Sequence, residues 1–347
     1  MQRRSLLAAI GALLAGGLRT DTTAKTASSS MPESRFIAWP VFAKTTPGIP
    51  TLDGHTDTVP DIVGRIGAND LVVFTEGNHF PVLFGGEVMQ LFRDWAKADR
   101  RFANIRLEDI AVVTLPQPII VAALRQGALK LGNAIIEVSA RSGFYPDIVM
   151  AGESPLRDLR RDGIVPAQAR LFARNRGLAL LVRRGNPLGI ASIADLQNPQ
   201  VRIVMASATE PGARGQYIHA LEALMGEGET KATLARETVT FEGRLGIQHR
   251  DILEALAKNQ ANVGIIFAHL ARYYARTFPD LVEMIEVPGA ERFSSTIALT
   301  AAAAPLHPHA AIAFEEFFLG IARGLYPRYG FAAMLPEEYD RKLDLNA

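Results

Sequence analysis

From Asp70 onward, short apolar runs alternate with amphipathic segments along the chain. Runs of four or five apolar residues between turn-forming residues are typical of buried strands, whereas apolar residues at helical spacing are typical of helices that cover a sheet. We predict strands at residues 71–74, 110–113, 135–138, 146–150, 178–182, 201–205 and 263–267. We predict helices over residues 84–98, 122–126, 212–224 and 251–259, with one helical turn at 193–196.

This alternation favours an α/β fold in which mainly parallel sheets are flanked by helices on both faces. The chain has 347 residues, which is enough for about two domains. In such sheets ligands bind beyond the carboxyl ends of the strands. The loops that follow the predicted strands are therefore the place to look for binding residues.

The start of the chain follows another pattern. Arg3 and Arg4 precede an apolar run at residues 6–18, which Arg19 closes. A basic start before an apolar run too short to span a bilayer is typical of an export signal. The adjacent arginines resemble the twin-arginine signal. We therefore expect a signal peptide and a disordered mature start over residues 1–30, export by the twin-arginine route, and a periplasmic protein.

Composition excludes several function classes. The chain has no cysteine, so it has no disulfide, thiolate metal site, cysteine nucleophile or lipid-attachment cysteine. The formal net charge is +1 at pH 7, which provides no basic field for nucleic acid. Fingerprints of phosphate-binding loops, dinucleotide sites and serine hydrolases do not occur in the sequence. We expect a monomer without a cofactor or a metal and without stable membrane insertion after signal removal.

Several segments share the order and spacing of the motifs of one known family. Residues 174–187 hold an Asn-Arg pair, an apolar strand and Gly-Asn-Pro, and Ser-x-x-Asp-Leu follows at 192–196. Further matches are a strand, a ligand loop, a return crossover and a terminal helix that ends in Tyr-Gly-Phe, at residues 201–204, 207–212, 263–267 and 326–331. Together the chain from about residue 69 to residue 335 resembles the extracytoplasmic solute-binding proteins of ABC importers, in the molybdate- and tungstate-binding group.

The resemblance implies a type II periplasmic-binding-protein fold, with two α/β lobes joined by two crossover strands that act as a hinge. Lobe one would comprise residues 69–177 and 269–335, and lobe two residues 178–268. Residues 31–68 would form an irregular N-terminal arm, and residues 336–347 a C-terminal tail. A small anionic solute, best matched by molybdate or tungstate, would bind in the cleft for delivery to an ABC permease in the inner membrane. The resemblance implies no enzymatic activity.

Donors for an anion are expected in the loops after the strands, because helix N-termini there offer free N–H groups and a partial positive charge. The first candidate loop holds Gly77, Asn78 and His79, and the second holds Ser207 and Thr209. The second loop matches the ligand loop that the resemblance implies for lobe two. Each loop also has a simpler interpretation as a helix cap with surface side chains.

Four other positions are candidate ligand contacts. Thr114 and Ser154 follow strands of lobe one, and Arg250 can bind an anion through two N–H groups or pair with a neighbouring acid. Phe267 stands where the molybdate group often has a ligand-binding tyrosine. The group usually has small residues at Glu76, whose carboxylate would repel an oxyanion. Another oxyanion, or a small organic anion held by Arg250, therefore remains an alternative ligand.

A competing motif occurs at residues 54–60, which resemble the metal motif His-x-Asp-x-Val-Pro of zinc aminopeptidases and deacylases. There the histidine binds one zinc ion and the aspartate bridges two, which would be His55 and Asp57 here. Those enzymes also need a mid-chain Glu-Glu pair, whereas the pairs in this chain fall late, at residues 315–316 and 337–338. A zinc hydrolase is the alternative from another class. A sensor subunit that signals to a membrane kinase is a third hypothesis.

Overall fold

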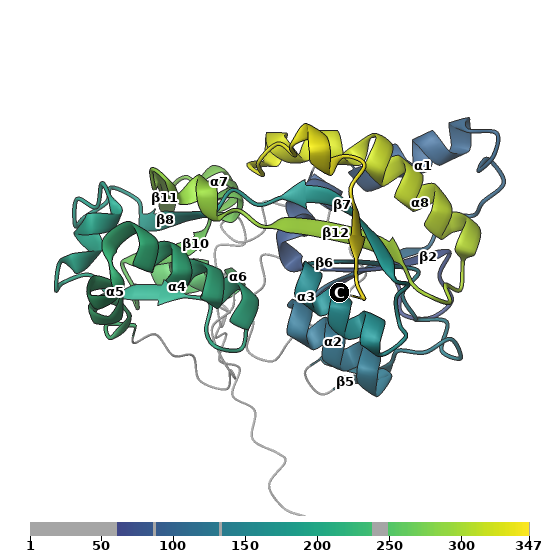
Figure 1. Ribbon diagram of the computed structural model, residues 1–347, viewed down its shortest axis with the longest axis horizontal. Coiled ribbons are helices and arrows are strands. Elements are labelled where there is room, and N and C mark those ends of the chain that lie inside the picture. Colours follow the sequence, from purple (N-terminus) through teal and green to yellow (C-terminus); the bar gives the residue numbers. More distant parts are fainter. Residues whose placement is uncertain (1–60, 86–87, 132–133, 238–248, 347) are drawn as a thin grey trace, which may run out of the picture.

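The computed structural model describes residues 61–346 except 86–87, 132–133 and 238–248. The expected signal peptide, the arm up to residue 60, and His55 and Asp57 of the zinc motif lie outside the described residues. Figure 1 shows two lobes joined by extended segments that lead out of one lobe and back into it. The strands next to these segments are β7 (Gln168–Arg174), β8 (Leu178–Arg183) and β12 (Thr296–Ala301). The predicted two-lobe α/β fold is confirmed.

Lobe one is built on a sheet of seven strands, counted over the described residues. Their order is β1 (Ile62–Val63), β3 (Ile110–Thr114), β2 (Leu71–Thr75), β6 (Ile148–Ala151), β12, β7 and β13 (Lys342–Asp344). β2 pairs in parallel with β3 and β6, as the pattern predicts, whereas the other pairs are antiparallel. The sheet is therefore mixed rather than mainly parallel. The expected C-terminal tail contributes an edge strand, β13, and the expected arm contributes β1.

Helices cover both faces of this sheet (Figure 1). α1 (Val88–Ala98) and α8 (Pro308–Gly320) lie on one face, and α2 (Gln117–Gln126) and α3 (Glu153–Arg161) lie on the other. Successive side chains of a strand point to opposite faces. Leu71 and Val73 of β2 therefore pack with α1 and α8, whereas Val72 and Phe74 pack with α2 and α3. Burial on both faces explains the unbroken apolar run that predicted this strand.

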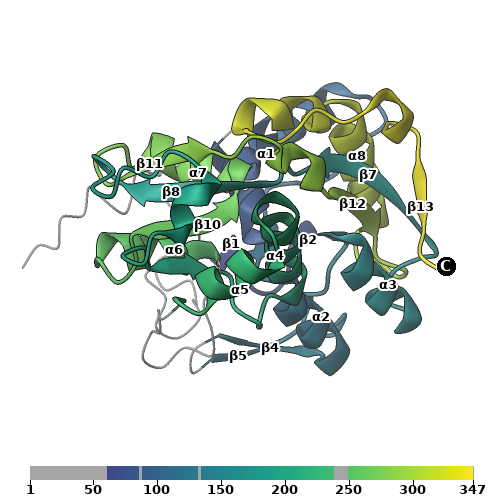
Figure 2. The same cartoon turned by 60° about the vertical axis from the view of Figure 1, so that its left-hand side comes forward.

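The predicted strand at residues 135–138 lies outside the main sheet. β4 (Ala128–Leu131) and β5 (Ala134–Glu137) form an antiparallel hairpin of their own beside α2 (Figure 2). Ile135 is 76% exposed, whereas Ile136 is buried. This alternation is that of a strand with one covered face.

Lobe two is built on a four-stranded mixed sheet, again counted over the described residues. Its order is β11 (Val282–Glu286), β8, β10 (Val263–Phe267) and β9 (Ile203–Met205), with β10 antiparallel to β8 and parallel to β9. Its helices are α4 (Pro211–Met225), α5 (Glu227–Leu234), α6 (His249–Ala257) and α7 (Ala268–Thr277). Short helical turns occur at η2 (Gly77–His79), η3 (Pro81–Gly85), η4 (Ile193–Gln197), η5 (Ala290–Phe293), η6 (Ala322–Tyr329) and η7 (Pro336–Glu338).

The boundary between the lobes differs from the expected one. The sequence predicts a return to lobe one at residue 269, but the chain stays in lobe two through α7 and β11. Leu270 and Tyr274 belong to the core of lobe two, and β11 pairs with β8. The chain returns at Ser295, just before β12. β11 escaped prediction because it is an edge strand in which acidic residues alternate with apolar ones, so it has no continuous apolar run.

The two crossover segments are hydrogen-bonded to each other at the hinge. The backbone N–H of Asn175 donates to the carbonyl oxygen of Ser295 at 2.9 Å, and the N–H of Ser295 donates to Asn175 Oδ1 at 3.0 Å. Gln216 of α4 accepts a hydrogen bond from each of these two side chains. Next to them, Gly177 has a φ of +75° and accepts the N–H of Ala268 at 2.9 Å. We call these contacts the crossover clasp.

A column of five stacked rings connects the lobes. It consists of His249, Phe267 and His269 from lobe two, followed by Phe331 and His79 from lobe one. Successive ring centroids are 5.2, 5.5, 3.9 and 5.7 Å apart, with interplanar angles between 14° and 27°. His269 is buried, and its ring nitrogens have no hydrogen-bond partner among the described residues. Desolvation lowers the pKa of His79 to about 3 and lowers the pKa of His269 well below its usual value.

Replacing Gly177 with alanine should strongly destabilise the protein. A positive φ disfavours any side chain, and the added Cβ would lie 2.0 Å from the carbonyl oxygen of Ala290. We expect the free energy of unfolding, measured by chemical denaturation, to fall by about 3 kcal/mol or more. The matched control is Gly163→Ala, which has a φ of +73° and no atom within 4 Å of its Cβ. It should lose only about 1–2 kcal/mol, and equal losses would contradict tight packing at the crossover.

Acid should destabilise the ring column. The pKa values of His79 and His269 are lower in the native protein than in the unfolded chain. Below about pH 6.5 the unfolded chain therefore binds more protons than the native protein, and the free energy of unfolding decreases as the pH is lowered. His269→Phe keeps a ring in the column and needs no hydrogen bond. The free energy of unfolding, measured with urea at about pH 7 and about pH 5, should decrease by about 2 kcal/mol less in this variant than in the wild-type protein. His309→Phe, at an exposed position of α8, is the control. An unchanged loss in His269→Phe would contradict neutral burial.

Candidate functional site

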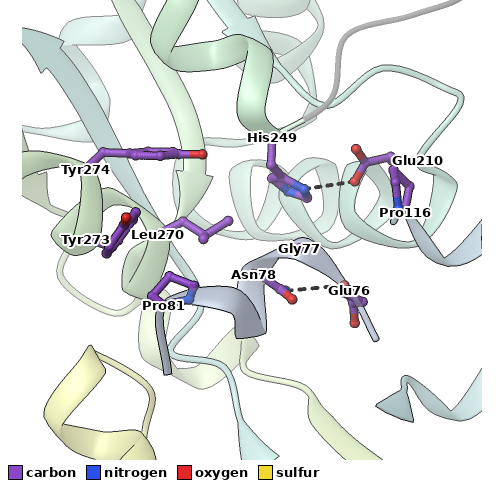
Figure 3. Close-up of a pocket in the computed structure, with 10 residues that line it drawn as sticks. All are labelled: Glu76, Gly77, Asn78, Pro81, Pro116, Glu210, His249, Leu270, Tyr273 and Tyr274. Carbon is purple, nitrogen blue, oxygen red and sulfur yellow. Dashed lines mark hydrogen bonds and ion pairs between the residues drawn. The ribbon is translucent and has the colours of Figure 1, made fainter. Parts of the chain in front are cut away.

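A small pocket lies between the two lobes (Figure 3). Lobe one and lobe two each contribute five lining residues: Glu76, Gly77, Asn78, Pro81 and Pro116 from the first, and Glu210, His249, Leu270, Tyr273 and Tyr274 from the second. The cavity volume is about 40 Å³, and a single water molecule needs roughly 10–15 Å³. The space therefore suits a few water molecules or one small ion rather than a peptide.

Two helices begin at this pocket. α2 begins directly after Pro116 and α4 begins directly after Glu210, whereas α6 is described from His249 onward. A helix N-terminus offers free N–H groups and a partial positive charge of about half an elementary charge. Among the described side chains that line the pocket there is no lysine or arginine. In this part of the structure, the helix N-termini and the imidazole of His249 are therefore the groups at the pocket that can favour a negative charge.

Glu76 follows β2 and places a carboxyl group at the pocket (Figure 3). Its Oε2 accepts a hydrogen bond from Asn78 Nδ2 at 3.2 Å, and its Oε1 accepts one from Gln117 Nε2. Desolvation in the cleft raises the pKa of Glu76 to about 7; His249 opposes this rise and the Glu210 carboxylate adds to it. Near neutral pH, Glu76 is therefore present in both its charged and its neutral form.

On the opposite wall, Glu210 and His249 form a fixed pair. His249 Nδ1 lies 2.8 Å from Glu210 Oε2, and His249 Nε2 lies 2.7 Å from the Tyr217 hydroxyl. That hydroxyl accepts the backbone N–H of Phe267 at 2.9 Å. Because both ring nitrogens have partners, the imidazole orientation is set. The Glu210 carboxylate thus already faces a group that can carry a positive charge.

Asn78 has an unused hydrogen-bond acceptor. The side chain is 8% exposed, and its Nδ2 donates to Glu76. Its Oδ1 is buried and has no hydrogen-bond partner in the described structure. A buried acceptor without a donor costs about 1–3 kcal/mol. This cost falls on a residue that lines the pocket, which is the place where a ligand can supply a donor.

The residues of the first predicted loop differ in whether they line the pocket. Gly77 and Asn78 line the pocket, as the sequence predicts for ligand contacts. His79 instead points into the core of lobe one, where its ring packs against Phe172 and Tyr326 and stacks in the ring column. Its burial follows from the helical turn of η2, which directs successive side chains to different sides.

The other predicted residues lie around the pocket without lining it. Ser207 and Thr209 hydrogen-bond to each other at 2.8 Å, in the turn that leads to the lining residue Glu210. Thr114 is buried at the end of β3, and Ser154 is exposed in the first turn of α3.

Two predicted residues lie close to the pocket in the chain. Phe267 is buried at the end of β10 and belongs to the ring column rather than to the pocket wall. The backbone of Arg250 lies in α6, next to His249, and its side chain is outside the described part of the structure.

Sequence reasoning did not select Glu210, His249 or the two tyrosines of α7. A signal for Glu210 exists, because it stands directly before Pro211, and proline at the first position of a helix marks the helix start. His249 has no comparable signal beyond its place at the start of a predicted helix. Tyr273 and Tyr274 could not be predicted as lining residues, because the sequence placed the return to lobe one before α7.

Within residues 61–346, outside the gaps, no group of three or more His, Cys, Asp or Glu side chains is arranged to hold a metal ion. The helices of this same part of the chain are all too short or too polar to cross a membrane.

Comparison with known proteins gives relatives of low identity. The chain is 26% identical to the sulfate-binding protein of Synechococcus elongatus over 215 residues, which is 58% of this chain and 61% of that relative. The match thus spans less than two thirds of the relative's length. Among solved structures, the sulfate-binding protein SubI from Mycobacterium tuberculosis H37Rv is similar with a TM-score of 0.55 and 16% identity, covering 78% of this chain and 89% of SubI. Peb3 from Campylobacter jejuni has a TM-score of 0.50 and 14% identity, covering 76% of this chain and all of Peb3.

These structural likenesses show that the fold is shared. A family model described as bacterial extracellular solute-binding protein matches residues 119–332, which is more than half of the chain. The matched segment begins within α2 and ends just after Phe331, so it includes all of lobe two and the crossover clasp. The chain belongs to the bacterial extracellular solute-binding protein family.

Proposed function

We propose that this protein captures a small oxyanion in the interlobe pocket and delivers it to an ABC importer. The observation that carries the proposal is the convergence of two helix N-termini, that of α2 from lobe one and that of α4 from lobe two, on one small cavity. Backbone N–H groups and helix dipoles bind anions without a cationic side chain. Family membership supports a binding role, and the sulfate-binding relative supports an oxyanion as the ligand class.

Lobe closure would complete the site. Lobe one supplies Glu76 and Asn78, and lobe two supplies Glu210 and His249, so neither lobe holds the pocket alone. A ligand that contacts both walls stabilises the conformation in which the lobes meet. The closed form would then signal loading to a permease of the inner membrane. The role is one of transport, without catalysis, in a monomeric periplasmic protein exported by the twin-arginine route.

The identity of the oxyanion is a finer proposal. The motif resemblance favours molybdate or tungstate, and the sulfate-binding relative favours sulfate. All of these anions are small, and all would be attracted by the same helix N-termini. The helix starts of α2 and α4 would therefore define the ligand class, and the side chains that face the ligand would decide among its members.

A thermal-shift panel tests the proposal. Purified mature protein is heated with sulfate, inorganic phosphate, molybdate, tungstate and small carboxylates, each at millimolar concentration. At roughly 100 times its dissociation constant, a true ligand should stabilise the folded protein by about 2.7 kcal/mol. Absence of a shift with every oxyanion in the panel would reject the proposed ligand class.

Paired variants locate the binding site. His249→Leu removes a polar ring from the pocket wall and should weaken the affinity for the active oxyanion at least about 10-fold, measured by calorimetry. Ser154→Ala, an exposed position outside the pocket, should leave the affinity unchanged. Equal affinities of the two variants would place the ligand elsewhere.

A further inference from the structure

We propose that the solute is an oxyanion that keeps a proton on one oxygen at neutral pH, as inorganic phosphate and arsenate do, and that Glu76 accepts a hydrogen bond from this O–H group. This inference rests on the proposed function, because it specifies the ligand class of the same pocket. It predicts discrimination against sulfate, molybdate and tungstate, which carry no proton at neutral pH and offer only acceptors.

The charges around the pocket are the first argument. The ionisable side chains that line it are Glu76, Glu210, His249, Tyr273 and Tyr274. The Glu210 carboxylate is paired with His249 at 2.8 Å. Among the described residues, the hydrogen-bond partners of Glu76 are the neutral amides of Asn78 and Gln117, and no cation pairs with it. Any oxyanion beside the Glu76 carboxylate meets like-charge repulsion, and only an oxyanion with an O–H group offsets it by donating a hydrogen bond.

The unused hydrogen-bonding capacity is the second argument. An ionised carboxylate has about four lone-pair sites, and Glu76 accepts one hydrogen bond on each oxygen from a side-chain amide. Acceptor capacity therefore remains on Glu76. Asn78 Oδ1, on the same wall, is a second acceptor without a donor. Two acceptors call for a donor on the ligand, and an oxyanion supplies one only if it keeps a proton.

Size and dipoles restrict that donor to a small anion. The cavity of about 40 Å³ has room for one tetrahedral ion. The ionised oxygens of such an ion can accept hydrogen bonds from the N–H groups at the starts of α2 and α4, while its O–H group donates to Glu76. A cationic amine would satisfy Glu76 but would be repelled by the two positive helix ends.

The charge state of Glu76 makes the selectivity depend on pH. Above its pKa of about 7 the carboxylate can only accept hydrogen bonds, so it favours a protonated oxyanion. Below that value the neutral carboxyl group can donate to a proton-free oxyanion such as sulfate. Two other ionisable groups of the pocket face Glu76 most directly: Glu210, which stands directly before α4, and His249 of α6. Tyr273 and Tyr274 of α7 complete the ionisable lining. Sulfate affinity should therefore rise as pH falls, relative to phosphate affinity.

Calorimetry with matched anions tests the inference. Inorganic phosphate, arsenate, sulfate, molybdate and a phosphate monoester dianion are titrated into the wild-type protein at about pH 8 and about pH 6. At the higher pH we expect phosphate and arsenate to bind at least about 100-fold more tightly than the three proton-free anions, because these leave buried acceptors unpaired. At the lower pH the preference over sulfate should shrink about 10-fold or more. This experiment uses only the wild-type protein, so its result does not depend on whether the variants fold.

Substitution of the carboxyl group supplies the second arm. Glu76→Gln keeps the side-chain shape and adds an N–H donor, so it should lower phosphate affinity, raise sulfate affinity and bring the two within about 10-fold of each other. Glu153→Gln removes one negative charge from an exposed residue of lobe one and is the matched control. It should preserve the wild-type preference, and thermal melting verifies that both variants are folded.

The outcomes separate the inference from the function on which it rests. If no anion of the panel binds, the proposed oxyanion function fails. If sulfate or molybdate binds the wild-type protein as tightly as phosphate at about pH 8, the function stands and the inference is overturned. The inference is also overturned if phosphate is preferred but Glu76→Gln leaves that preference unchanged. Glu76 would then not be the group that accepts a hydrogen bond from the O–H of the ligand.

Discussion

The pairing of the two crossover segments is the contact on which the rest of this structure depends. Asn175 and Ser295 hold the outgoing and returning chain together through backbone and side-chain hydrogen bonds, and Gln216 ties both to lobe two. The pocket exists only where the lobes meet, because each lobe supplies half of its wall. By joining the lobes, these contacts hold the facing edges of two separate sheets on either side of one pocket. The ring column adds an apolar contact between the lobes without fixing them by charge.

Strands that are buried on both faces were predictable, and strands whose position depends on pairing with segments distant in sequence were not. Residues 71–74 and 263–267 are continuous apolar runs, and each forms a central strand. β7 and β11 mix charged and apolar residues because each has a partly exposed face. Their place in a sheet follows from pairing with strands that are distant in sequence. The lobe boundary was misplaced for the same reason. Because β11 was not predicted, the return to lobe one was expected before α7 rather than after β11.

The candidate site divides in the same way. Gly77 and Asn78 were predictable because a turn after a central strand lies at the ligand edge of such a sheet. Ser207 and Thr209 lie in the turn before the pocket, yet the lining residue is their neighbour Glu210, because the two hydroxyls bond to each other and the turn presents the next side chain. The pairing of His249 with Glu210 depends on how α6 packs against α4, and no local pattern encodes that distance.

Attraction by helix N-termini and selection among anions are separate tasks in this pocket. The helix starts of α2 and α4 would draw in any small oxyanion, because a dipole responds to charge and distance rather than to the identity of the central atom. Selection therefore needs groups that distinguish one oxygen from another, and an O–H differs from an ionised oxygen only in being a donor. The acceptors on the wall of lobe one, the Glu76 carboxyl and Asn78 Oδ1, are the kind of group that registers this difference. A carboxyl group that looks unsuited to an anion site is, by this reasoning, the feature through which such a site would become specific.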